Sequence, residues 1–163
     1  MSEWGLTTVE ITDELSFYEA CDILHDARFD LARTVYLPEE KRWTAIFSRE
    51  YFEGKGAVEE DRKFLIFRHY TFPLVESVLT LHSVCDLKVK DRAGINEFTF
   101  NEVAKIKDHY DLLFCENLRI RLRFDDEPRG ELKDTRFLER QGGFWTLGKY
   151  FRPESEALLQ RTP

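Results

Sequence analysis

The sequence predicts a mainly β protein, an antiparallel sandwich or partly closed barrel of seven or eight strands with a short N-terminal helix. Apolar and polar residues alternate through most of the chain, with the period of two that is typical of a half-buried strand. Turn residues separate the alternating segments at intervals of roughly 10 to 20 residues. No clear helical segment comes between the strands, which disfavours the alternating strands and helices of a parallel sheet.

The short helix is expected from about Asp13 to Leu24. Asp13 can cap its first turn, and Glu14 places an acid at the positive end of the helix dipole. Apolar residues then recur at i, i+3, i+4 and i+7, which puts them on one helix face. These residues are Phe17, Ala20, Cys21 and Leu24.

A hairpin and a third strand are expected next. The period changes to two at Phe29 and Leu31, and Arg33 is the one charged residue on their face. Aromatic and β-branched residues dominate the following segment, so it should return beside the first. In order, we expect a strand over 28–37, a turn over 38–41, a strand over 43–52, an acidic loop over 54–61, and a strand over 64–72 that Pro73 stops or bends.

The C-terminal half is predicted to be a meander. Its longest alternation, over 75–89, should form a central strand with Leu79, Leu81 and Leu87 in the core. Residues 98–106 are compatible with a strand or an irregular helix, and we favour the strand. The further expected strands are 118–124, 132–140 and 144–151, with turns over 91–94, 125–130 and 141–143, and 153–163 as a short helix or frayed tail.

Length and composition indicate one folded domain over residues 1–163. The chain is 42% hydrophobic and 34% charged, without a disordered composition or an apolar stretch long enough to span a membrane. Its formal net charge of −7 repels phosphate backbones, so we expect no nucleic acid as a partner, and without a spanning stretch we expect no membrane partner. Nothing at the N-terminus resembles a secretory signal, which predicts a cytoplasmic protein.

The run Cys21-Asp22-Ile23-Leu24-His25-Asp26-Ala27-Arg28-Phe29-Asp30 leads from the helix into the first strand. It resembles the opening of certain uncharacterised small β-rich bacterial proteins, in which a His-Asp-Ala stretch precedes the first strand. The resemblance covers about the first fifth of the chain and then only a pattern of short strands. It implies a β-rich fold and no particular activity, because no activity is assigned to that group.

No local catalytic or metal-binding motif is complete. Gly54-Lys55-Gly56 lacks the spacing of a phosphate-binding loop, and neither a Gly-x-Ser-x-Gly elbow nor a His-x-x-x-His pair occurs. The three cysteines are widely spaced, which predicts no disulfide framework and no zinc ribbon. The histidines are equally scattered, at His25, His69, His82 and His109. We therefore expect no metal and no cofactor.

Arg119, Arg121 and Arg123 alternate with apolar residues and should project from one face of a strand. Such a stripe suits an anionic ligand or an acidic partner. The alternative is a solvated face whose arginines pair with Glu131, with Asp134 or with acids of a neighbouring strand. We include His82, on the polar face of the 75–89 strand, with the three arginines as candidate ligand-binding residues.

His25, Asp26 and Asp30 are the candidate catalytic residues. A histidine with a carboxylate partner can act as a general base. If the extended segment begins at His25, however, His25 and Asp26 project to opposite faces and cannot meet one substrate. On that geometry His25 closes the edge of the core with a hydrogen bond to the backbone, and Asp26 and Asp30 lie in solvent.

The leading functional hypothesis is a non-enzymatic binding or protein-interaction domain, with a homodimer as one possible form, because every catalytic pattern fails. The alternative is a carrier of a small apolar or anionic ligand in a cavity lined by some of the many aromatic residues. A carrier requires a closed pocket of about 300 Å³ or more, entered near the arginine stripe. An enzyme that uses His25 and nearby acids is the third hypothesis.

Overall fold

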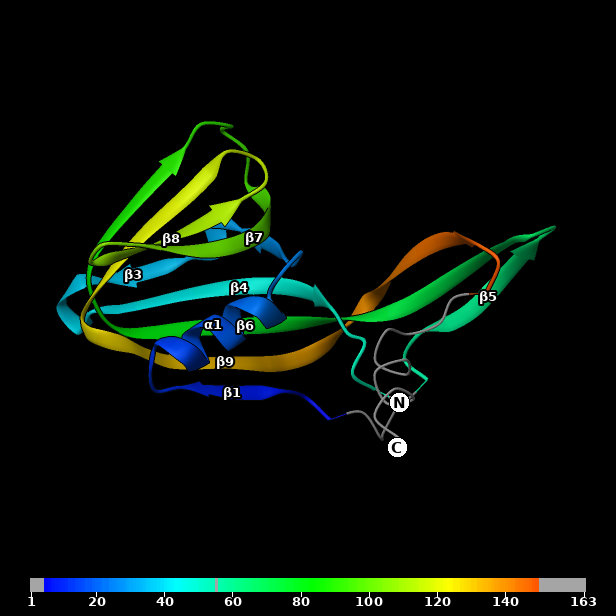
Figure 1. Ribbon diagram of the computed structural model, residues 1–163, viewed down its shortest axis with the longest axis horizontal. Helices are drawn as coiled ribbons and strands as arrows, with labels where there is room; N and C mark the ends of the chain where they lie inside the picture. The colour runs from blue at the N-terminus through cyan, green and yellow to red at the C-terminus, as the bar shows by residue number, and fades with distance from the viewer. Residues whose placement is uncertain (1–4, 55, 150–163) are drawn as a thin grey trace.

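Six antiparallel strands close into a barrel in the computed structural model, which describes residues 5–54 and 56–149 (Figure 1). Around the barrel the order is β9, β8, β7, β2, β4 and β6, and β6 pairs with β9 to close the ring. Three more strands extend the sheet, β1 beside β9, β3 beside β4 and β5 beside β6. This architecture confirms the predicted mainly β fold class with a short N-terminal helix.

The bounds of the strands are β1 (Thr8–Ile11), β2 (Arg28–Asp30), β3 (Val35–Leu37), β4 (Arg42–Glu50), β5 (Glu59–Phe64), β6 (Phe67–Asp91), β7 (Glu97–Ile106), β8 (His109–Phe114) and β9 (Leu118–Leu147). The helix α1 covers Glu14–Ile23, and short 3-10 turns cover Leu31–Arg33 and Pro38–Glu40. These bounds confirm the predicted helix, the turn over 38–41 and the strand over 98–106.

Two long strands, β6 and β9, run through the barrel and beyond it. Residues 75–91 of β6 pair with 118–137 of β9 within the barrel, and residues 67–73 pair with 141–147 outside it. With β5, the outer stretches form a three-stranded projection that we call the arm (Figure 1). Pro73 lies at a shift in the pairing register, so it bends the strand without stopping it.

The barrel interior is filled by apolar side chains. Phe29, Phe47 and Phe114 pack ring against ring, with centroids 5.2 Å apart for Phe29 and Phe47 and 4.7 Å apart for Phe29 and Phe114. The helix adds Phe17, whose ring meets those of Tyr110 and Phe124 edge to face. Leu79 and Leu81 are buried as predicted, whereas Leu87 is only partly buried at the edge of this cluster.

Asp13 anchors the start of α1. Its side chain accepts a hydrogen bond from the Ser16 backbone at 2.8 Å, and the Ser16 hydroxyl oxygen accepts one from the Asp13 backbone at 3.1 Å. This reciprocal capping satisfies backbone donors that the first turn of a helix leaves free. The cap therefore fixes where the helix begins, and its apolar face packs against β1, β7 and β9.

The predicted turns over 125–130 and 141–143 are wrong, because β9 stays extended through both. β6 pairs with residues 129–130 and 141–143, so the backbone groups of β9 bond there instead of turning back, and residues 125–128 are accommodated at a shift in the pairing register. Gly130 was expected to end a turn, but it lies within β9. A Cβ at this position would lie 1.9 Å from the carbonyl oxygen of Thr80, so glycine permits the close approach of β9 to β6.

Other boundaries also differ from the sequence prediction. The strand expected over 28–37 is broken by the 3-10 turn, where the Asp30 carboxylate accepts a hydrogen bond from the Ala32 backbone at 3.0 Å. The acidic loop expected over 54–61 and the strand expected over 64–72 also have wrong boundaries, because residues 59–64 form β5, the chain turns at 65–66 and β6 begins at Phe67. β1 and β8 had no predicted counterpart. The segment 153–163 lies outside the described residues.

Candidate anion-binding site

Cations gather on the outer face of the barrel where β6 and β9 run side by side. Lys88 pairs across the ladder with Arg121, and Lys90 pairs with Arg119. Paired residues project to the same face of a sheet, so these four side chains share one surface. We call the full set the basic face: Lys88, Lys90, Arg92, Arg119, Arg121 and Arg123.

The alternation along β9 explains why its arginines point outward. Ile120 and Leu122, between the three arginines, are fully buried in the barrel. Because successive residues of a strand face opposite sides, burial of these two sends Arg119, Arg121 and Arg123 to the outer surface. The predicted stripe therefore lies on one face of a strand, as expected.

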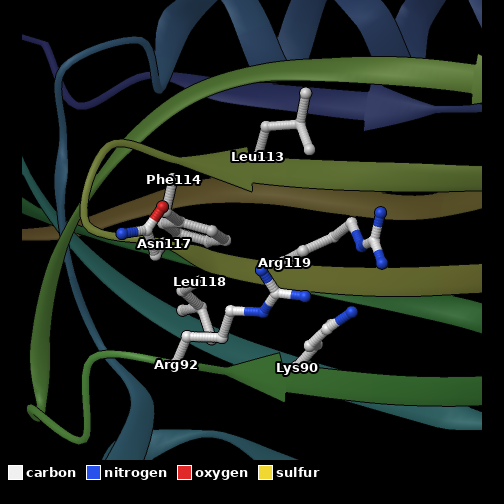
Figure 2. A pocket seen from close by; sticks show the side chains of 7 residues that line it. All are labelled: Lys90, Arg92, Leu113, Phe114, Asn117, Leu118 and Arg119. Carbon is white, nitrogen blue, oxygen red and sulfur yellow. The ribbon is translucent and has the colours of Figure 1, made fainter.

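A hollow of about 260 Å³ lies at one end of the basic face (Figure 2). The side chains of Lys90, Arg92 and Arg119 gather around it, with their nitrogen atoms on the same side of the sheet. Its remaining lining is Leu113, Phe114, Asn117 and Leu118. Three of these four residues are apolar, so the hollow combines a cationic rim with an apolar floor.

The cations of this hollow have few acidic neighbours. Within residues 5–54 and 56–149, neither Lys90 nor Arg92 forms an ion pair, and Arg119 has its nearest carboxylate, that of Asp111, at 3.8 Å. No carboxylate lines the hollow. Three positive charges close together repel one another, so the site gains electrostatic energy when an anion enters it.

Arg121 belongs to a structural pair instead. Its Nε and Nη2 atoms donate to the two carboxylate oxygens of Asp111 at 2.8 and 3.1 Å. Asp111 is almost completely buried, and the guanidinium of Arg121 lowers the pKa of its carboxyl group. The predicted acidic partner is therefore on β8, and it is neither Glu131 nor Asp134. Arg123 points away from the hollow, toward Asp108 at 3.9 Å.

The Asp111 pair makes stability depend on pH. A carboxyl whose pKa is lowered by folding stabilises the protein above its unfolded pKa of about 3.9, and this stabilisation is lost as the pH falls through the folded pKa. Asp111→Asn should therefore be less stable than wild type at neutral pH, by a margin that shrinks below about pH 4. Urea unfolding across a pH series measures this margin. A margin independent of pH would contradict the assignment, and exposed Asp126→Asn is the matched control.

The other candidate ligand-binding residue, His82, is not brought to the hollow. His82 is exposed on β6, where it pairs with Arg129 of β9. A shift in the pairing register separates it from the part of the strand that carries Lys88 and Lys90. Of the residues chosen from the sequence, only Arg119 lines the hollow. Lys90 and Arg92 were missed although Lys88, Lys90 and Arg92 continue the period of two past the end of the predicted strand.

The candidate catalytic residues lie near the turn after α1. Strand β2 begins only at Arg28, so the extended segment assumed to start at His25 is wrong. His25 Nε2 instead approaches the Asp26 carboxylate at 3.6 Å, and both side chains are more than half exposed. His25 Nδ1 contacts the Asn101 carbonyl oxygen at 2.5 Å, which is the expected hydrogen bond to the backbone. Asp30 caps the 3-10 turn through its hydrogen bond from the Ala32 backbone.

The chain matches no protein-family model, no curated protein and no solved structure. In the described part of the chain, no group of three or more His, Cys, Asp and Glu side chains is placed to hold a metal ion. No helix among those residues is long and apolar enough to cross a membrane. What the site does must therefore be inferred from its own residues.

Proposed function

We propose that this chain is a non-enzymatic binding domain that holds an anionic group in the hollow between Lys90, Arg92 and Arg119. The observation that carries the proposal is the gathering of three cations around an apolar floor with no carboxylate in the lining. Guanidinium groups bind carboxylate or phosphate through paired hydrogen bonds, and a lysine adds a point charge. An apolar part of the same partner can lie on the partly exposed Leu113.

The size of the hollow favours a group on a larger partner over a small molecule enclosed whole. Its volume of about 260 Å³ lies below the range of roughly 300 to 1,000 Å³ that is usual for ligand pockets. The net charge of −7 repels anions at long range, so recognition depends on these local cations. An acidic or phosphorylated segment of another protein fits both conditions.

The packing of the barrel favours a binding domain over a carrier. A carrier needs an empty interior, but aromatic rings such as those of Phe29, Phe47 and Phe100 occupy the core and are almost fully buried. The enzyme hypothesis has less support, because His25 and Asp26 are both exposed. A reducing, cytoplasmic setting fits the three free cysteines, Cys21, Cys85 and Cys115.

Titration with phenyl phosphate, which joins an anion to an apolar ring, tests the proposal. We expect saturable shifts of the backbone amide signals of Leu113, Asn117 and Arg119 in NMR spectra at low salt. Arg119→Gln should weaken the binding about tenfold or more, the factor expected when a charged hydrogen-bond donor is lost. Arg129→Gln, on the same strand outside the hollow, should bind like wild type. Absence of saturable binding, or equal weakening by both variants, would refute the site.

A further inference from the structure

The arm ends in an exposed apolar surface. β5 and β6 meet there in a hairpin turn, and Phe67 of β6 pairs with Leu147 of β9 (Figure 1). Six large apolar side chains, which are between 44% and 75% exposed, form what we call the apolar tip. They are Phe64, Leu65, Ile66, Phe67, Trp145 and Leu147. Large side chains of this kind are normally withdrawn from water, so such a group marks an interaction surface.

The turn at the tip carries apolar residues where turn-forming residues are normally found. Leu65 and Ile66 are its two central residues, and Leu65 has a φ of +53°. Two-residue hairpin turns favour Gly, which has no Cβ, and Asn, whose short polar side chain can hydrogen-bond locally, because most other residues are strained at positive φ. Leucine therefore costs stability at position 65, and both Leu65 and Ile66 leave large apolar side chains exposed, which points to a role for these side chains outside the fold.

Charges are layered behind the tip. Arg62 and Lys63 precede Phe64 on β5, and Arg68 follows Phe67 on β6. At about 3.3 Å per strand residue, these cations lie within about 7 Å of the tip along the strand. The acids of β5, Glu59, Glu60 and Asp61, come further back along the strand. Two of them pair with cations, Asp61 with Arg62 at 3.4 Å and Glu60 with Arg68 at 2.8 Å, so within the described residues Lys63 is the cation of β5 that keeps its full charge. Along the arm the order is therefore apolar, basic and then acidic.

Trp145 links the first two layers. Its ring is half exposed, and the Arg62 guanidinium carbon lies 5.9 Å from the ring centroid. Tryptophan is favoured at boundaries between an apolar phase and water, because its ring is apolar and its N–H is polar. Trp145 pairs with His69, which pairs with Arg62, so its ring lies at the level of the rear cations of the arm, where such a boundary is expected.

We propose that the apolar tip inserts into the headgroup layer of a bilayer that contains anionic phospholipids. Phe64, Leu65 and Ile66 then enter the apolar boundary region, Arg62 and Lys63 lie at the level of the lipid phosphates, and the acids stay in water. We expected no membrane partner because the chain has no spanning stretch. A tip that enters only the headgroup layer needs no such stretch.

A second copy of the chain fits the tip less well. The order of strands in the arm is β5, β6, β9, so pairing along the β5 edge leaves Trp145 and Leu147 uncovered. Contact between two tips buries on the order of several hundred Å² on each side, against about 800 Å² per partner in a standard interface. The charge layering also has no function in contact between two tips, whereas it matches the cross-section of an anionic bilayer.

Flotation of the full chain with lipid vesicles tests the proposal. Wild type should float with phosphatidylcholine vesicles that contain phosphatidylserine, and more weakly with phosphatidylcholine alone. Leu65→Asn with Ile66→Gly removes apolar area, Asn tolerates the positive φ of residue 65 better than Leu, and Gly adopts any turn conformation, so the fold should be kept while partitioning falls at least tenfold. Lys63→Gln should lower partitioning about fivefold on anionic vesicles only, since a cation near such a surface contributes about 1 kcal/mol.

Two control variants separate the tip from other surfaces. Leu15→Asn changes an exposed leucine on α1, and Arg129→Gln changes an exposed arginine of β9 outside both the hollow and the tip, so both should float like wild type. Brominated lipids should quench wild-type fluorescence through Trp145, and Trp145→Phe should lose most of that quenching. A wild-type chain that floats with neither vesicle, or a Leu65→Asn, Ile66→Gly variant that floats equally well, overturns the proposal. A concentration-dependent dimer that this double variant abolishes, without flotation, would assign the tip to a second copy.

Discussion

Replacing Asp134 with alanine should lower the free energy of unfolding by about 3 to 5 kcal/mol, because it removes one partner of a buried ion pair. Arg49 donates to the two carboxylate oxygens of Asp134 at 3.2 and 2.6 Å, and both side chains are almost completely buried. The Ser77 hydroxyl donates to the same carboxylate at 2.6 Å, and the Thr7 backbone at 3.0 Å. Asp134→Ala therefore leaves several buried donors without their acceptor.

The position of the pair explains why its loss should affect the whole molecule. Arg49 lies near the end of β4, Ser77 on β6 and Asp134 on β9, so one carboxylate joins three neighbouring strands where the arm leaves the barrel. Arg49 keeps a hydrogen bond to the Glu50 carbonyl oxygen at 3.2 Å in the variant, and one ion pair, with the half-exposed Glu53 at 2.5 Å. That remaining contact is too exposed to replace a buried one.

Urea unfolding at neutral pH measures the effect of Asp134→Ala. Glu131→Ala is the matched control, since Glu131 is an exposed acid on the same strand, and its midpoint should shift little. A double variant, Arg49→Met with Asp134→Leu, should be less destabilised than Asp134→Ala, because it leaves no charge unpaired. Equal midpoints for Asp134→Ala and Glu131→Ala would show that the pair contributes nothing.

Leu81→Ala should cost about 2 to 5 kcal/mol, the range for truncation of a buried leucine that leaves a cavity. Leu81 is fully buried and lies in the middle of β6, opposite Trp43 of β4 on one side and Gly130 of β9 on the other. Glycine has no side chain to fill the space that the lost methyl groups leave, so the surrounding structure should relax little and the cavity should remain.

The same substitution at an exposed leucine provides the control for Leu81→Ala. Leu15 is 67% exposed on α1, and alanine is the better helix former, so Leu15→Ala should change the unfolding midpoint by very little. Thermal and urea unfolding should both separate the two variants clearly. A Leu81→Ala midpoint near that of wild type would mean that the strand is not central to the core.

Interactions between residues that are close in the sequence were enough to predict the helix and the buried face of the alternating strands. The cap at Asp13 and the spacing of Phe17, Ala20 and Leu24 predicted the helix, because both act within a few turns of chain. Alternation predicted which face of each strand is buried, as with Ile120 and Leu122 inside and the arginines outside. Residues 59–64 were missed as a strand because they are exposed throughout and show no alternation.

The tertiary structure decided which strands are neighbours, and with that the candidate site. Alternation assigns a residue to a face but does not specify the strand beside it, which depends on long-range pairing and packing. Only the pairing of β6 with β9 brings Lys90 and Arg92 beside Arg119, and only the pairing of β8 with β9 gives Arg121 its partner Asp111. The same pairing keeps residues 129–130 and 141–143 extended despite their turn-forming composition, because β6 satisfies their backbone hydrogen bonds, and residues 125–128 lie at a register shift within β9.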